Sequence, residues 1–379
     1  MVVVEAHAGG GRARTDERSG YRFNQGPHAL YRGGEAWRIL RDLGVPHRGH
    51  QPPLRGASGA RDGKLVRLLG VPAGSLMTRL LKASPARWAG RSAEEWAGSL
   101  GGSGDVSELA RMFIRVTTYV ADLEGMPADL AIAQMKMGLL GGVSYLDGGW
   151  ASLVDGLSSA ASAAGAVIRV RQAAVAISPG PGRGWEVTLA GGEVLPAAAV
   201  VVAAGGPAAA GKLLPVDPGW PELGPPVTAA CLDLGLRGHR PMLVFGLDEP
   251  FYLSRHCPPG DLAPPGGSVV HVMRYGARDA RRDRPELERY ARLAGITDDH
   301  TVEERFLADM VVTHVLPGPQ LGLAGRPGVT VRGAEGLYLA GDWVGPTGWL
   351  ADAAMASGRH AGMLAARVPA GDRPYPRAA

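Results

Sequence analysis

The residues with the clearest chemical potential are Gly341 and Asp342, which follow an apolar run at residues 337–340. The run predicts a short buried strand, and Gly348 lies in the loop after it. The pattern then turns helical over residues 350–367. Because the first turn of a helix presents unpaired N–H groups and a positive dipole end, this helix would direct both at whatever occupies the loop. A strand-end carboxylate beside a helix start therefore predicts a binding site.

This stretch resembles the C-terminal flavin motif of the phytoene desaturase and flavin-containing amine oxidase superfamily. The resemblance implies that Asp342 holds the ribityl or pyrophosphate region of FAD, and that the N-terminus of the following helix points at the isoalloxazine ring. The other cofactor-binding positions that it implies in this stretch are Gly341, Gly348, Leu350 and Ala353.

A second candidate site lies at the start of the chain, where a β-branched run ends in Glu5. In a dinucleotide-binding fold, the acidic residue that closes the second strand accepts hydrogen bonds from the adenosine ribose, and Glu5 fits that role. The following Gly10, Gly11 and Arg12 resemble the GGR turn of the same superfamily. There the glycines permit close backbone approach to the cofactor, and the arginine offers charge-assisted donors.

In such a fold, a strand, a G-x-G-x-x-G turn and a helix are expected before Val2, because that turn holds the pyrophosphate at a helix N-terminus. The glycines at 9–11 cannot substitute, since Arg14 occupies the third glycine position. We therefore expect a Rossmann-like FAD-binding domain truncated at its N-terminus. A start internal to a longer protein is the favoured explanation, and a fingerprint that was lost or is supplied otherwise is the alternative.

Two further segments resemble the superfamily. Residues 20–31 resemble the segment that returns under the flavin, and within it His28 is a candidate to touch flavin or substrate, with a structural hydrogen-bonding role equally open. Residues 145–177 resemble the central segment, where Val175 would flank the adenine.

These patterns predict an α/β protein in which a discontinuous, Rossmann-like FAD-binding domain alternates with a mixed α+β substrate domain. The expected FAD-binding parts are residues 1–50, 141–215 and 326–379. The expected substrate domain consists of a helical part at 51–140 and a sheet part at 216–325.

Composition narrows the function further. The 40 Lys+Arg and 36 Asp+Glu residues are nearly balanced and the basic ones are scattered, so a nucleic-acid partner is not expected. Cys231 and Cys257 form no CxxC, and His256 and His271 have no second ligand at metal-binding spacing, so no metal site is expected. Without a membrane-spanning apolar run or a signal peptide, a cytoplasmic location is the default. Peripheral membrane contact stays open, because an apolar substrate would favour it.

The leading hypothesis is an FAD-dependent oxidoreductase, in which flavin N5 accepts a hydride from a substrate C–H and the protein orients the substrate. Amine oxidases of this superfamily resemble one another in carrying a lysine in the later substrate sheet. Here the only lysines are Lys64, Lys82, Lys136 and Lys212. We therefore expect a desaturase-like enzyme acting on an apolar, carotenoid- or polyene-like small molecule, with an amine as the alternative substrate.

Two other classes stay open. A chain without the phosphate-binding turn is compatible with a cofactor-poor, non-catalytic relic. A nicotinamide-dependent dehydrogenase is compatible with Glu5, although the Gly-Asp-helix ending suits a flavin better. The oligomeric state and the electron acceptor do not follow from the sequence.

Overall fold

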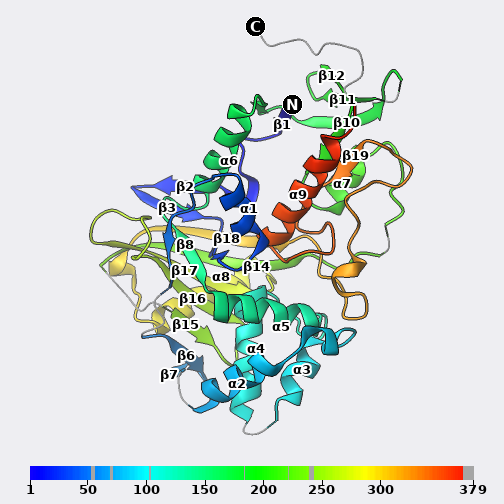
Figure 1. Ribbon diagram of the computed structural model, residues 1–379. Helices are drawn as coiled ribbons and strands as arrows, with labels where there is room; N and C mark the ends of the chain where they lie inside the picture. The colour runs from blue at the N-terminus through cyan, green and yellow to red at the C-terminus, as the bar shows by residue number, and fades with distance from the viewer. Residues whose placement is uncertain are drawn as a thin grey trace.

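The computed structural model describes residues 1–52, 56–68, 71–101, 104–182, 184–220, 222–238 and 243–369. Figure 1 shows the N-terminus, β10–β12 and α9 in its upper part, and a large sheet with α2–α5 in its lower part. Segments far apart in the sequence build each part.

The upper part contains two parallel strand pairs. β1 (Val2–Glu5) pairs with β9 (Val167–Val170), and β13 (Val200–Val202) pairs with β19 (Leu337–Leu339). The apolar runs explain the strands, because β-branched residues favour extended backbone. The two pairs are separate sheets, and Val2 and Val201 keep 47% and 37% of their surface exposed.

Helices and a small antiparallel sheet complete this part. The helices are α1 (Glu35–Asp42), α6 (Ala151–Ala163), α7 (Pro207–Leu213) and α9 (Ala351–Ala365). The sheet consists of β10 (Ala174–Pro179), β11 (Trp185–Leu189) and β12 (Val194–Ala197). α1 packs against α9, and α9 packs against β19 (Figure 1). Helices from the first 50 and the last 30 residues of the chain thereby pack together.

The lower part is organised around a seven-stranded sheet in the order β18-β14-β17-β16-β15-β6-β7. Its strands are β6 (Ser58–Arg61), β7 (Lys64–Arg67), β14 (Val227–Arg237), β15 (Leu243–Gly246), β16 (Phe251–Cys257), β17 (Gly267–Tyr275) and β18 (Thr301–Thr313). All neighbours are antiparallel except β15 and β6, which are parallel. The central strands are buried on both faces, which explains their nearly continuous apolar sequences.

A helical layer covers one face of this sheet, which we call the inner face. It contains α2 (Val71–Lys82), α3 (Ala93–Ser99), α4 (Gly104–Thr118) and α5 (Ala128–Lys136), and a π-helical turn at Met137–Gly141 follows α5. A capping box between Ser92 and Glu95 begins α3 and satisfies two N–H groups at the helix start. α8 (Ala280–Leu293) packs on the opposite face, where Asp279 caps its first turn.

Short strands link the two parts. β2 (Thr15–Arg18) and β3 (Tyr21–Asn24) form a hairpin, and β8 (Val143–Leu146) pairs with β4 (Leu30–Tyr31) and β5 (Gly49–His50). The 3-10 turns are Gly11–Ala13, Pro85–Trp88, Asp298–His300 and Gly322–Gly325. Parallel strand pairs with flanking helices, together with a large mixed sheet, confirm the predicted α/β class.

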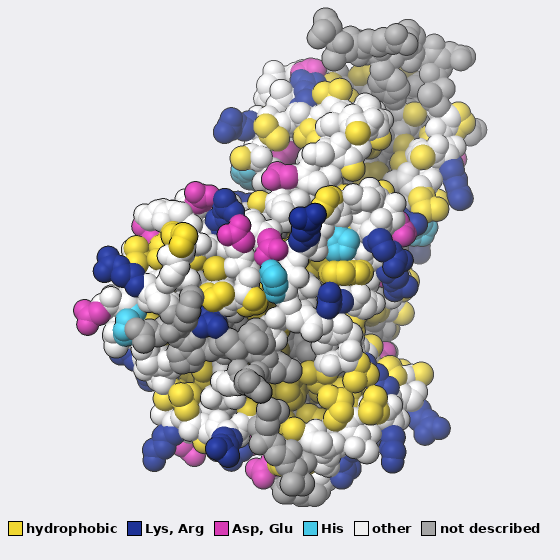
Figure 2. Space-filling view, turned by 60° about the vertical axis from the view of Figure 1, so that its left-hand side comes forward, with side chains coloured by type: hydrophobic (Ala, Val, Ile, Leu, Met, Phe, Trp, Pro, Cys, Tyr) yellow, Lys and Arg dark blue, Asp and Glu magenta, His cyan; other side chains and the backbone are white. Residues whose placement is uncertain are grey.

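Two surface properties bear on function. None of the described helices is both long and apolar enough to cross a bilayer. Figure 2 shows basic and acidic side chains interspersed over the face it presents, in agreement with the scattered arginines of the sequence.

Candidate functional site

Asp342 follows β19 and is 2% exposed. Its Oδ2 accepts hydrogen bonds from Arg12 Nη1 at 3.1 Å and from the His314 backbone N–H at 3.0 Å, and its Oδ1 lies 2.8 Å from His314 Nδ1. The structure thus brings together two residues that the sequence singled out separately. His314 was missed, because nothing near it in the sequence indicates a partner.

The charge of Asp342 is balanced at the site. Burial alone would raise the pKa of this carboxyl, but the hydrogen bond from His314 and the charge of Arg12 outweigh burial and hold the pKa well below its usual value. The carboxylate is therefore ionised at neutral pH. The Arg12 side chain remains 40% exposed, so its guanidinium keeps donors for a further anionic group.

The loops after β13 and β19 lie side by side at the carboxyl ends of these parallel strands. Trp343 Nε1 donates to the Gly205 carbonyl at 2.8 Å, and Gly341 N donates to Ser357 Oγ of α9 at 3.0 Å. A Cβ on Gly341 would lie 2.7 Å from Trp343 Nε1, so only glycine fits there. The carboxyl ends of parallel strands are where open α/β sheets bind ligands.

The backbone before α9 is unusual. Leu350 has φ 54° and Gly348 has φ +72°. A Cβ on Gly348 would lie only 2.8 Å from Asp352 Cβ, so a larger residue would clash with the first turn of α9. Ala353, in the same turn, is fully buried. A leucine with positive φ is strained, and such residues persist only where their surroundings hold them.

Arg326 supplies that support. Its guanidinium donates to the carbonyls of Gly345 at 2.7 Å, Asp342 at 2.9 Å, Gly348 at 3.1 Å and Thr347 at 3.2 Å. Burial lowers the pKa of Arg326 to about 10, so it stays charged at neutral pH. Arg326 therefore fixes the whole loop between the strand and the helix. Arg326 was not among the residues that the sequence singled out.

Glu5 is the last residue of β1, and Gly10 and Gly11 lie in the segment that follows. Glu5 Oε1 accepts a hydrogen bond from the His7 N–H at 2.8 Å. Gly10 and Gly11 have φ +83° and +49°, a left-handed backbone that glycine adopts most readily. Val175 lies on β10, with 50% of its surface exposed.

His28 lies in the loop after β3. Its Nδ1 is 3.1 Å from the Gly26 carbonyl, and its ring packs edge-on against Trp150 at 4.8 Å between centroids. Burial lowers the pKa of His28 to about 4, so the ring is neutral at neutral pH. A Cβ on Gly26 would lie 2.7 Å from Met310 Sδ, so this loop lies directly on the inner face of the seven-stranded sheet.

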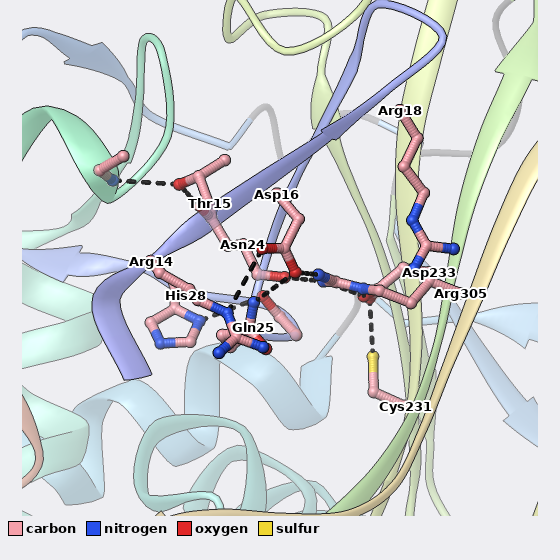
Figure 3. Close-up of polar contacts among 12 residues, drawn as sticks. Arg14, Thr15, Asp16, Arg18, Asn24, Gln25, His28, Cys231, Asp233 and Arg305 are labelled. Carbon is pink, nitrogen blue, oxygen red and sulfur yellow. Dashed lines mark hydrogen bonds and ion pairs between the residues drawn. The ribbon is translucent and has the colours of Figure 1, made fainter. Parts of the chain in front are cut away.

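A charged network lies beneath this loop, as Figure 3 shows. Arg305 of β18 donates to Asp233 at 2.9 Å through Nε, to Asp16 at 2.6 Å through Nη1, and to the Asn24 carbonyl. Cys231 Sγ donates to Asp233 at 3.1 Å (Figure 3). Sequence reasoning missed this network, because its members come from strands far apart in the chain.

Aromatic side chains gather elsewhere on the inner face. Phe245 stacks on Tyr252 at 5.5 Å, Tyr119 packs edge-on against Tyr275 at 6.2 Å, and the hydroxyls of Tyr145 and Tyr252 are 3.1 Å apart. The lysines lie elsewhere: Lys64, Lys82 and Lys212 are exposed, and Lys136 donates to the Leu81 and Ala83 carbonyls.

A family model of flavin-containing amine oxidoreductases matches residues 1–238. The chain belongs to this family. It is therefore a flavin-dependent oxidoreductase, and FAD is its cofactor. This confirms the resemblance on which the sequence prediction rested.

Solved structures share the fold. An oxidoreductase from Methanosarcina mazei has a TM-score of 0.74 and 16% identity, over 96% of this chain and 99% of the other. Cyclohexylamine oxidase from Brevibacterium oxydans has a TM-score of 0.67 and 14% identity, over 96% of this chain and 93% of the other. A CLA-producing fatty acid isomerase from P. acnes has a TM-score of 0.65 and 9% identity, over 96% of this chain and 90% of the other. A search of curated proteins found no match.

The residues present fit FAD. Arg12 keeps accessible donors for a phosphate, Gly10 and Gly11 leave the backbone bare, and the start of α9 offers N–H groups. When bound, FAD supplies a hydride acceptor. Arg12 and the N–H groups at the start of α9 are the groups that would hold the cofactor.

Proposed function

We propose that this chain is a desaturase-like flavoenzyme that removes a hydride from a C–H bond of an apolar, polyene-like small molecule. The observation that carries the proposal is the inner face of the seven-stranded sheet, where tyrosine, phenylalanine and methionine side chains gather and the four lysines lie elsewhere.

The tyrosines of this face suit an apolar ligand. Burial raises the pKa values of Tyr119, Tyr145 and Tyr275 well above the usual value, so their phenols stay neutral. Neutral rings present large apolar faces with defined stacking geometry. A conjugated substrate can stack on such rings, and no lysine ammonium is needed for it.

For the cofactor, we propose that Arg12 and the start of α9 contact the pyrophosphate and ribityl region, with Asp342 holding Arg12 in place. Glu5 would accept hydrogen bonds from the adenosine ribose, and Val175 would flank the adenine. These assignments are supported by the 3.1 Å ion pair between Arg12 and Asp342 and by the position of Glu5 at the carboxyl end of a parallel strand.

An amine is the second candidate substrate. Paired tyrosine rings such as Tyr252 and Tyr275, with centroids 6.5 Å apart, offer electron-rich faces that attract a cation. The fold occurs both in an amine oxidase and in a fatty acid isomerase, so the fold alone does not choose between the two substrate classes.

We further propose that the protein reaches its apolar substrate at a membrane surface. Three leucines of the lower part support this contact. Leu65, Leu81 and Leu140 keep 43%, 56% and 51% of their surface exposed. Flotation with neutral lipid vesicles tests it. Leu81→Ser should reduce the floated fraction, and equal flotation of the variant and the wild type would contradict the proposal.

The deciding experiment is anaerobic mixing of the FAD-loaded protein with a panel of polyenes and primary amines, followed through the visible absorbance of the flavin. Bleaching by polyenes and not by amines is the expected result. Bleaching by amines alone would replace the proposal with the amine alternative. A protein that retains no FAD after loading and desalting would contradict the cofactor assignments and favour a non-catalytic role.

A further inference from the structure

A buried carboxylate–imidazole pair lies on the inner face, outside the cofactor anchors. Asp233 of β14 and His271 of β17 are directly opposite each other in the strand register. His271 Nδ1 lies 2.6 Å from Asp233 Oδ1, and both side chains are fully buried. The pair is therefore held rigidly by two neighbouring strands of one sheet.

The carboxylate of this pair is ionised. Burial would raise the pKa of Asp233, but the charges and hydrogen bonds of His271 and Arg305 outweigh burial and lower the pKa. Arg305 makes two contacts to Oδ2, at 2.9 Å through Nε and 2.5 Å through Nη2. Because an ionised carboxylate only accepts, His271 Nδ1 carries the proton that is donated to it.

This arrangement leaves His271 Nε2 as a free acceptor. Within the described part of the chain, Nε2 is buried and has no hydrogen-bond partner. A histidine whose Nδ1–H is held by a carboxylate has the tautomer and orientation of a general base. Cys231, which also donates to Asp233, stays protonated, because burial raises its thiol pKa well above the usual value.

A metal site is the competing interpretation, because the ligand atoms of Cys231, Asp233 and His271 lie within 4.8 Å of one another. However, the carboxylate already accepts from all three of its polar neighbours, including the Arg305 guanidinium. A positive charge at this position opposes a cation. The arrangement therefore favours a base over a metal ligand set.

The surroundings of Nε2 suit a reacting group. The His256 ring packs edge-on against His271 at 4.5 Å and stacks on Tyr145 at 3.7 Å. Both ring nitrogens of His256 are also buried without a partner among the described residues. Burying polar atoms without partners is unfavourable, so such atoms cluster where water or a ligand is bound.

The titratable groups that face the pair come from several elements. His256 lies on β16, His28 on the loop above, and Arg305 on β18. Burial lowers the pKa of His256 well below its usual value and the pKa of His28 to about 4, so both rings are neutral at neutral pH. His271 is the imidazole of this cluster whose Nδ1 is held by a carboxylate, which leaves its Nε2 as the acceptor.

We propose that His271, oriented by Asp233, is the base of the desaturation reaction. Making a C=C bond removes two hydrogens from adjacent carbons. One leaves with its electron pair as the hydride taken up by FAD, and the other leaves as a proton to His271 Nε2. The electron pair of the second C–H bond forms the new π bond, and Asp233 stabilises the imidazolium until the proton returns to water. This inference rests on the proposed function.

Single-turnover reduction of the FAD-loaded protein tests the base. His271→Gln should slow flavin reduction by the polyene about 100-fold or more, the usual contribution of a general base, with FAD content unchanged. Asp233→Asn should give a smaller loss and change the pH profile of the reduction rate. His360→Gln, on the exposed side of α9, is the control and should react at the wild-type rate.

Nitrogen NMR of the wild-type histidines provides a readout independent of turnover. His271 should carry its proton on Nδ1, and an Nε2–H tautomer would overturn the proposal even if the variants fail to fold. Reduction of His271→Gln at the wild-type rate overturns the base alone. A wild-type flavin that neither polyenes nor amines reduce overturns the proposed function and the base together.

Discussion

Arg12 Nη1 lies 3.1 Å from Asp342 Oδ2, an ion pair that joins residues 330 positions apart in the sequence. The carboxylate is buried and the guanidinium is partly exposed. Asp342 therefore acts from within the protein, holding a guanidinium that is itself partly exposed. The pair joins the turn after β1 to the loop after β19.

Replacing this carboxylate should release the cofactor. We expect Asp342→Ala to reduce bound FAD substantially, because Arg12 keeps only the Val312 carbonyl as an acceptor and His314 loses its carboxylate partner. The free energy of unfolding should fall by about 1–3 kcal/mol, the range for a charged hydrogen-bond partner. The measurement is flavin absorbance after desalting, together with a thermal melt. The exposed Asp309→Ala is the matched control, and unchanged FAD content in Asp342→Ala would remove Asp342 from the site.

Much of the fold could be predicted from local patterns. The strands at Val2–Glu5 and Leu337–Leu339 and the helix at Ala351–Ala365 follow from apolar runs and helical periodicity. By contrast, β18 and α8 were not predicted. β18 mixes charged with apolar residues, so it has no strict alternation. α8 does carry Leu287, Tyr290 and Ala291 at helical spacing, and sequence reasoning overlooked this signal among its arginines and glutamates.

The site was predictable only in part. Arg12 and Asp342 were each found from a local motif, but their contact depends on tertiary folding. The pairing of Asp233 with His271 depends on the register of β14 and β17, which hydrophobic patterns do not reveal when both strands are buried on both faces. Arg326 donates to backbone carbonyls, which no sequence pattern identifies as acceptors. His314 contacts the Asp342 carboxylate, which lies 28 positions further along the chain.

A second prediction concerns Glu5. If its carboxylate binds the adenosine ribose, Glu5→Ala should weaken FAD affinity by about 1–3 kcal/mol, the scale of a charge-assisted hydrogen bond. Titration of the FAD-free protein, followed by flavin fluorescence, measures the change. Glu17→Ala, on the exposed β2–β3 hairpin, is the control. An affinity for FAD equal to that of the control would exclude Glu5 from the ribose site.

A third prediction concerns pH. Asp352 is buried where its Oδ1 accepts the Ala36 N–H at 2.8 Å, and burial raises its pKa from 3.8 to about 6. Because the folded state holds this proton more tightly than the unfolded state, Asp352 lowers stability as pH rises from about 4 to about 6. The loss then persists at higher pH.

Asp352→Asn keeps the acceptor for Ala36 and removes the charge. The variant should be more stable than the wild type at pH 8 by roughly 1–3 kcal/mol, and the difference should shrink below about pH 4. Urea unfolding at several pH values provides the measurement. A difference that is the same at all pH values would show that the carboxyl is not perturbed by burial.

The last prediction concerns Arg326, whose four carbonyl contacts hold the loop between β19 and α9. A lysine keeps the charge but has no planar fork, so Arg326→Lys cannot reproduce these contacts. We expect a loss of about 2–4 kcal/mol in the free energy of unfolding, because buried carbonyls lose donors. FAD affinity should fall with it, since Leu350 is no longer held at its strained φ of 54°.

Hydrogen exchange across residues 343–350 should accelerate in the Arg326→Lys variant. Arg332→Lys, at an exposed position, is the control and should leave the exchange rate unchanged. Exchange in Arg326→Lys as slow as in the wild type would mean that other contacts hold the loop.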